Sequence, residues 1–138
     1  MTYFIKQIYG PAAQTEQYPQ TIIHFAKGRE AELNRFLNCH GFLLYETGSG
    51  GGAKAIYGYG TVSSNQNRTV SAREANGVTF TLGAWVDTVH VVNPQNGVPL
   101  QEMTEVLGIY NIQRRGGIVE ITEEQFANLK NRLLMRAR

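Results

Sequence analysis

The sequence predicts an α+β fold, with a small barrel-like sheet of mixed strands and short helices beside it. Short apolar runs of strand length alternate with segments whose apolar residues recur at helical spacing, and Gly, Pro and polar stretches separate them. This order, several strands with short helices interspersed, is typical of an α+β domain. A length of 138 residues with 42% hydrophobic residues fits one domain, which we place at residues 1–138.

Four strands and one helix are predicted in the first half of the chain. The apolar run that starts at Tyr3 stops at Gly10-Pro11, which ends a strand. Residues 28–37 have an imperfect apolar face of helical spacing, so we expect a helix there. The glycine-rich residues 48–52 should be a flexible connection without any regular element. The predicted strands are residues 3–9, 21–25, 42–45 and 55–62, the last with Ile56 and Gly58 on one face and Tyr57 and Tyr59 on the other.

The second half ends with two predicted helices. Pro99 fits the first position of one helix, and Gly108 fits its C-cap, with apolar residues at helical spacing between them. Thr122 and Gln125 have the spacing of a capping box, which marks the start of the last helix. Before these helices we expect a loop at residues 63–76, one long strand or two strands broken near Gly83 at residues 77–92, and a turn at residues 93–97.

Composition and cysteine content exclude several classes of protein. The apolar fraction and 10% aromatic residues exclude a disordered chain, and a single cysteine excludes a disulfide scaffold or a cysteine-based zinc site. No apolar run reaches the ~18 residues that a membrane-spanning helix needs, so no membrane partner is expected. The residues after Met1 do not resemble a signal peptide, and we expect a cytoplasmic protein.

The charge distribution favours a local binding pocket over a broad basic surface. The net charge of +2 comes from 13 basic and 11 acidic residues, and nine of the basic residues are arginines, which suit phosphate recognition and stacking on bases. Arg132, Arg136 and Arg138 lie at the end of the predicted C-terminal helix, where they counter its dipole. Without these three, basic and acidic residues almost balance. Any nucleic-acid binding would therefore depend on a confined site.

The sequence does not support a phosphate-binding loop, a metal site or a nucleophile–base pair. Residues 48–54 are glycine-rich, but they lack the Gly-Lys-Ser/Thr of a phosphate-binding loop and precede a predicted strand instead of a helix. His24, His40, His90 and Cys39 do not have the spacing of metal ligands, and the adjacency of Cys39 and His40 does not support a nucleophile–base pair. We therefore expect no metal and no cofactor, and assign no catalytic residue.

Aromatic residues on or near the predicted strands are the best candidates for a ligand site. Their flat, rigid rings can hold an unstacked base, although strand aromatics more often pack in a core. The sequence leaves both alternatives open. The candidate site has three groups: Tyr45, Tyr59 and Trp85 for stacking; Glu46, Thr47 and Asp87 for contacts to the edge of a base; and Lys54, Arg68 and Arg73 for phosphate.

Three segments, taken in order, resemble the EVE domain and its wider PUA-like superfamily. Phe42-Leu-Leu-Tyr-Glu-Thr-Gly48 and Lys54-Ala-Ile-Tyr-Gly-Tyr-Gly-Thr-Val62 are similar to the family's strand pair. Residues 89–103 are similar to its strand that runs into a short helix, and residues 117–126 to its closing turn and last helix. The resemblance implies a PUA-like pseudo-barrel of mixed strands with flanking short helices, and recognition of RNA or of modified DNA bases.

These observations lead to three hypotheses about function. The first is a non-enzymatic module that binds RNA or DNA and recognises a modified base in an aromatic-lined pocket. The second is an amidohydrolase of acylated nucleosides, as ASCH-type relatives in the superfamily imply; Glu46, Thr47 and Lys54 match the residue types of their site, although not its spacing. The third is a protein-interaction module without a ligand pocket, in which the aromatic residues form the core.

Overall fold

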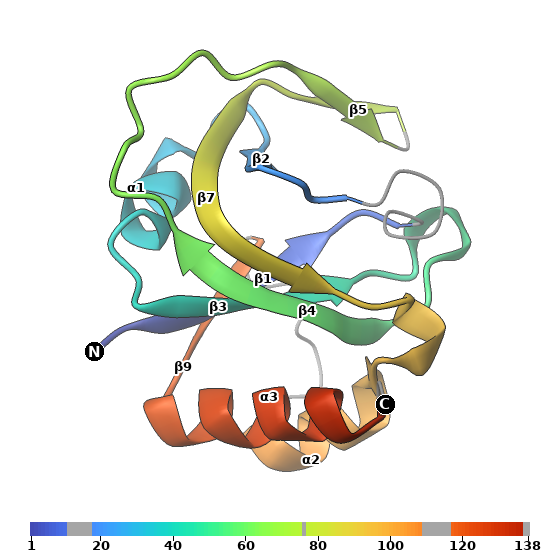
Figure 1. Ribbon diagram of the computed structural model, residues 1–138. Coiled ribbons are helices and arrows are strands. Elements are labelled where there is room, and N and C mark those ends of the chain that lie inside the picture. The colour runs from blue at the N-terminus through green and yellow to red at the C-terminus, as the bar shows by residue number, and fades with distance from the viewer. Residues whose placement is uncertain (11–17, 76, 109–116, 137–138) are drawn as a thin grey trace.

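The computed structural model describes residues 1–10, 18–75, 77–108 and 117–136 (Figure 1). A strongly curled sheet forms the centre of the molecule. Helices α2 (Leu100–Leu107) and α3 (Glu123–Arg136) lie together below the sheet, and α1 (Glu30–Phe36) packs at the side of the curl. The predicted α+β fold, a pseudo-barrel of mixed strands with flanking short helices, is confirmed.

Within the described residues, seven strands make up the curled sheet. Their spatial order is β2-β7-β4-β3-β1-β9, and β8 pairs with β4. β1 and β3 run parallel, so their carboxyl ends lie at the same edge, whereas their other neighbours pair with them antiparallel. The strands are β1 (Tyr3–Ile8), β2 (Ile22–Phe25), β3 (Gly41–Glu46), β4 (Ala55–Val62), β7 (Leu82–Val91), β8 (Val98–Pro99) and β9 (Ile118–Ile121).

Apolar side chains form one cluster on each face of the sheet. Successive residues of a strand point to opposite faces, so Phe4 of β1 packs in the cluster inside the curl, while Ile5 packs in the outer cluster beneath α2 and α3. Phe36 anchors α1 in the inner cluster, and Leu129 anchors α3 in the outer one. Burying each such side chain contributes about 1.5–3 kcal/mol. With both faces covered, the central strands have apolar residues on both sides.

A β-bulge in β4 changes which of its side chains share a face of the sheet. The register of β3 against β4 shifts between Leu44 and Tyr45, which leaves Tyr57 as an extra residue on β4. Tyr57 consequently packs in the inner cluster, whereas Ile56 and Tyr59 pack with the outer one. The prediction that Tyr57 and Tyr59 share a face is wrong, because the bulge interrupts the alternation on which it depends.

Two segments predicted to be irregular contain short regular elements. In the glycine-rich connection, Ser49–Gly51 form a short 3-10 turn, η1, which is kinked at Gly50, where the backbone is non-helical with a positive φ of 62° that glycine adopts readily. The end of the predicted loop forms β5 (Arg73–Ala75), which pairs antiparallel with β6 (Val78–Phe80), the first of two strands in the region predicted as one long strand or two. This second, two-stranded sheet lies across the open side of the curl from β1 (Figure 1).

Helix ends follow the predicted signals. Gln125 N–H donates to Thr122 Oγ1 at 3.0 Å and Thr122 N–H donates to Gln125 Oε1 at 2.9 Å, which confirms the capping box of α3. Gly108 is the left-handed C-cap of α2, with a φ of 70°. Pro99 is the N-cap of α2 and not its first helical residue, so the helix begins one residue later than predicted, at Leu100.

Candidate functional site

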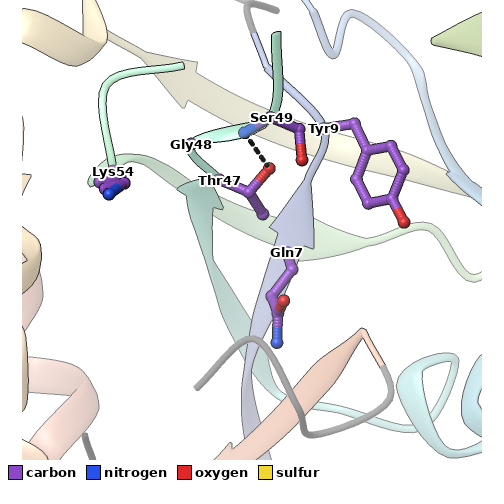
Figure 2. A pocket seen from close by; sticks show the side chains of 6 residues that line it. All are labelled: Gln7, Tyr9, Thr47, Gly48, Ser49 and Lys54. Atoms are coloured by element: carbon purple, nitrogen blue, oxygen red, sulfur yellow. Dashed lines mark hydrogen bonds between the residues drawn. The ribbon is translucent and has the colours of Figure 1, made fainter. Parts of the chain in front are cut away.

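A cavity of about 320 Å³ opens at the carboxyl ends of β1 and β3. The parallel pairing brings these ends together, and Thr47 N–H donates to the Ile8 carbonyl oxygen at 2.9 Å just beyond them. Side chains that follow two neighbouring strands therefore meet around one opening, although they lie about forty residues apart in sequence. The lining residues are Gln7, Tyr9, Thr47, Gly48, Ser49 and Lys54 (Figure 2).

The buried carboxylate of Glu46 holds the glycine-rich segment beside the cavity. Glu46 is 1% exposed, and its Oε1 accepts a hydrogen bond from Ala53 N–H at 2.8 Å. Gly10 and Gly52 pack tightly around it, since a Cβ on Gly10 would lie 2.7 Å from Glu46 Cγ and 2.8 Å from Gly52 Cα. Glu46 thus positions the cavity wall from behind.

Two hydroxyls and one ammonium group border the opening. Ser49 N–H donates to Thr47 Oγ1 at 3.4 Å, which folds the segment back on itself (Figure 2). Lys54 has a positive φ of 54°, which is uncommon for a residue with a side chain. Its carbonyl oxygen accepts from Leu100 N–H at 3.0 Å, and its side chain lies so close over Gly48 that a Cβ there would clash with it. The hydrogen bond to the Lys54 carbonyl oxygen therefore fixes the backbone of this residue beside the cavity.

Tyr9 provides the aromatic side of the cavity. Its ring meets Phe80 of β6 edge-on, with centroids 5.4 Å apart and planes at 89°. Arg73 of β5 donates from Nη2 to the Tyr9 carbonyl oxygen at 3.4 Å and stacks over the Tyr18 ring at 4.0 Å. These contacts link the two-stranded sheet to the end of β1 and orient Tyr9 next to the opening.

A buried lysine lies on the inner face of β1, beside the strand end that forms the cavity. Lys6 is 5% exposed; its Nζ donates to the Gln7 carbonyl oxygen at 2.8 Å and lies 4.6 Å from the centre of the Phe25 ring. Burial, together with the positive charges of Arg73 and Arg29, lowers the pKa of Lys6 from 10.5 to about 7. The ammonium form of Lys6 is therefore disfavoured in this interior, mainly by the loss of hydration.

Comparison with known proteins identifies a fold but not a family. No protein-family model and no curated protein sequence matches the chain. Among solved structures, the complex of the YTH domain-containing protein mmi1 with RNA matches with a TM-score of 0.62 and 14% identity, over 96% of this chain and 80% of that one. The crystal structure of the MmI1 YTH domain matches with a TM-score of 0.61 and 14% identity, over 99% of both chains. The fold resembles that of a YTH domain.

The YTH-like fold distributes the nine predicted site residues over several places. Thr47 and Lys54 line the cavity, and Glu46 lies behind its wall. Arg73 lies at the neighbouring two-stranded sheet, against Tyr9 and Tyr18. Tyr59, Arg68, Trp85 and Asp87 lie elsewhere, on or over the outer faces of β4 and β7.

Tyr45 does not share an aromatic pocket with Trp85. It is 0% exposed and belongs to the outer apolar cluster, because β3 is a central strand whose outer face is covered by α2 and α3. Trp85 is partly exposed on β7, between Ala84 and Val86, which point into the curl. The stacking pair proposed from the sequence is therefore not formed, since the two rings are on different strands and in different surroundings.

The sequence did not single out Gln7, Tyr9, Gly48 or Ser49 as site residues. Their connection depends on the parallel pairing of β1 with β3, which no local pattern announces. One signal was available: Lys6 and Gln7 are polar residues within an otherwise apolar run that ends at Tyr9-Gly10. Polar residues in a buried strand indicate a role beyond packing.

Three further observations concern a metal site, a cysteine nucleophile and a membrane-spanning helix. Across the part of the chain that the structure describes, no group of three or more His, Cys, Asp or Glu side chains is placed to hold a metal ion. Burial raises the pKa of the Cys39 thiol to about 11, which disfavours the nucleophilic thiolate. Of the helices described, none is both long and apolar enough to cross a membrane.

Proposed function

We propose that this chain is a nucleic-acid-binding module that takes one base of an RNA strand into the cavity at the ends of β1 and β3. The observation that carries the proposal is the composition of the cavity, in which an aromatic ring, an amide, two hydroxyls and a lysine border one opening. A volume of about 320 Å³ is near the lower limit of small-ligand pockets and suits a single base better than a larger ligand.

Each lining group has a chemical role in this proposal. Tyr9 stacks on the base, and the Gln7 amide, which can donate and accept, reads its edge together with the hydroxyls of Thr47 and Ser49. Lys54 contacts the adjacent phosphate as a point charge. Because Lys54 is exposed and held by its backbone, it can make this contact without a rearrangement of the cavity.

The fold likeness supports an RNA ligand, since one of the similar YTH-domain structures is a complex with RNA. The resemblance of residues 42–48 and 54–62 to the EVE domain supports the narrower proposal that the base is modified and that the chain is EVE-like. These segments form most of β3 and all of β4, and they contribute Thr47, Gly48 and Lys54 to the cavity. The strand pair that resembles the EVE domain thus supplies part of the cavity wall, and β1 and the residue after it supply Gln7 and Tyr9.

Binding of fluorescein-labelled single-stranded RNA, measured by fluorescence anisotropy, tests the proposal. Loss of one base–aromatic stack costs ~1–3 kcal/mol, so Tyr9→Ala should weaken binding by roughly ten- to a hundredfold. Tyr9→Phe keeps the ring and should restore most of the affinity. Oligonucleotides with and without one methylated base, compared on the same variants, test the narrower proposal. Equal affinities of wild type and Tyr9→Ala would exclude the cavity as the site.

The amidohydrolase alternative uses the same cavity, because Thr47 and Lys54 both line it. It requires Glu46 to reach a substrate, yet one carboxylate oxygen of Glu46 is bound to Ala53 N–H. Incubation with N-acylated nucleosides separates the two functions. Release of the acyl group by wild type, abolished in Lys54→Ala, would favour the enzyme, whereas unchanged nucleoside together with RNA binding favours the module.

A further inference from the structure

The outer face of β4 and β7 carries a strip of residues that extends from the edge of α3 to the part of β7 beyond it, and most of the strip is exposed or partly exposed. Tyr59 pairs with His90 across the two strands, and Thr61 pairs with Thr88 farther along. Beyond them on β7, Trp85 is the next outward-facing aromatic residue. We call Tyr59, Thr61, Trp85, Thr88 and His90 the outer strip.

One end of the outer strip is a stack of two rings and a cation. The rings of Tyr59 and His90 lie 4.9 Å apart and nearly parallel, at 24°. Lys130 of α3 extends over this stack, with its Nζ 4.6 Å from the centre of the Tyr59 ring. His90 is exposed, so the edge of the stack is accessible to solvent.

The other end pairs a tryptophan with an arginine. The Arg68 guanidinium lies 4.9 Å from the centre of the Trp85 ring. Gln66 fixes the backbone beneath them: its Nε2 donates to the Trp85 carbonyl oxygen at 2.8 Å, and its Oε1 accepts from Trp85 N–H at 2.9 Å. In the described parts of the chain, the buried indole Nε1 of Trp85 has no hydrogen-bond partner.

We propose that the outer strip binds the strand of single-stranded RNA that flanks the base held in the cavity; this rests on the proposed function. Both ends combine an aromatic face with a cation, which suits a base and its phosphate. Along a strand at ~3.3 Å per residue, the five steps from Trp85 to His90 separate the two ends by roughly 17 Å. Other sheets that expose aromatic residues stack two or three bases over a comparable face.

The middle of the outer strip distinguishes an RNA strand from a protein partner. Thr61, Asp87 and Thr88 are exposed there and present hydroxyls and a carboxylate. A protein interface normally has a desolvated apolar centre, which this surface lacks. Hydroxyls and a carboxylate can instead accept hydrogen bonds from the amino groups of bases, while Arg68 and Lys130 contact the backbone at either end.

The test compares two double variants that remove the same charge. Arg68→Gln/Lys130→Gln removes the cations of the outer strip. Arg29→Gln/Arg35→Gln removes two exposed arginines at the N-cap and in the last turn of α1, which form surface ion pairs with Glu32 and Glu120. The probes are fluorescein-labelled single-stranded RNAs of 3 and 12 nucleotides. We expect the first variant to lose at least tenfold in affinity for the 12-mer and its salt slope to fall by roughly 1.4, since each phosphate contact contributes about 0.7 on single strands. Its affinity for the 3-mer, and the control variant's affinity for both probes, should change less than twofold.

The fluorescence of Trp85 gives a second, local measurement, because it is the only tryptophan in the chain. Stacking of a base should change its emission when the 12-mer is added, and at saturating RNA the change should persist in Tyr9→Ala. Binding of the 12-mer without any change in this emission, or an equal loss in both double variants, would overturn the proposal. If Tyr9→Ala weakens binding but Arg68→Gln/Lys130→Gln does not, only the outer strip fails. If wild type binds neither RNA, the proposed function fails with it.

Discussion

Replacement of Lys6 by methionine tests the charge balance inside the curled sheet. The ammonium group of Lys6 is buried against Phe25, and the Gln7 carbonyl is its hydrogen-bond acceptor among the described residues. Burial, together with the positive charges of Arg73 and Arg29, lowers its pKa from 10.5 to about 7. Methionine has a similar length and no charge, so Lys6→Met removes the titration while it largely keeps the packing.

The sign and size of the pH effect follow from this pKa. Between pH 7 and pH 10.5 the unfolded chain binds the Lys6 proton and the folded protein does not, so folding stability rises with pH in this range. Each pKa unit corresponds to about 1.4 kcal/mol, so the contribution of Lys6 to the free energy of unfolding should grow by about 2 kcal/mol from pH 7 to pH 9. Below pH 7 the folded protein also binds the proton, and the contribution levels off.

Urea unfolding at pH 6, 7, 8 and 9 measures the effect, with Trp85 fluorescence and far-ultraviolet circular dichroism as the signals. The difference in unfolding free energy between wild type and Lys6→Met cancels other titrating groups. We expect the unfolding free energy of wild type to rise by about 2 kcal/mol relative to that of Lys6→Met from pH 7 to pH 9. Lys27→Met, at an exposed lysine, serves as the control and should give a constant difference. Parallel pH curves for wild type and Lys6→Met would refute the reasoning.

Three further predictions concern stability and reactivity. Gly60→Ala should cost several kcal/mol, on the order of other overpacked core sites, because its Cβ would clash with the Thr88 carbonyl oxygen; urea unfolding measures this. Thr122→Ala should cost ~1 kcal/mol through loss of the cap to Gln125 N–H, and an unchanged melting temperature would contradict it. Cys39 should react with iodoacetamide at pH 8 at least about tenfold more slowly than free cysteine, and at the normal rate in urea, as mass spectrometry can follow.

The sequence predicts much of the fold because local signals specify the elements. The strand at residues 55–62 matches β4 at both ends, and the capping box marks the start of α3. The bulge at Tyr57 escapes such reasoning, since it results from the pairing of β4 with β3 and leaves no mark in the alternation of residues. The 3-10 turn at Ser49–Gly51 is likewise set by its surroundings, because glycines permit many conformations.

The site is less predictable because its residues are joined by topology. Thr47 and Lys54 follow and precede neighbouring strands, so sequence reasoning could place them near each other. Tyr9 joins them through the parallel pairing of β1 and β3, which the sequence does not specify. Tyr45 shows the converse problem: β3 is apolar on both faces, so the sequence does not indicate which aromatic ring is open and which is covered by helices.

The distribution of ion pairs gives the small net charge a functional interpretation. The two described arginines at the end of α3 share the carboxylate of Glu102, at 2.8 and 3.4 Å, so both are ion-paired although its single negative charge balances only one of them. Lys54 at the cavity and Arg68 and Lys130 at the outer strip, by contrast, have no carboxylate within ion-pair distance in the described residues. A phosphate that approaches these three cations does not have to break an existing ion pair, and therefore avoids that cost. A net charge of only +2 is thus compatible with the proposed binding of an RNA strand at a few defined points.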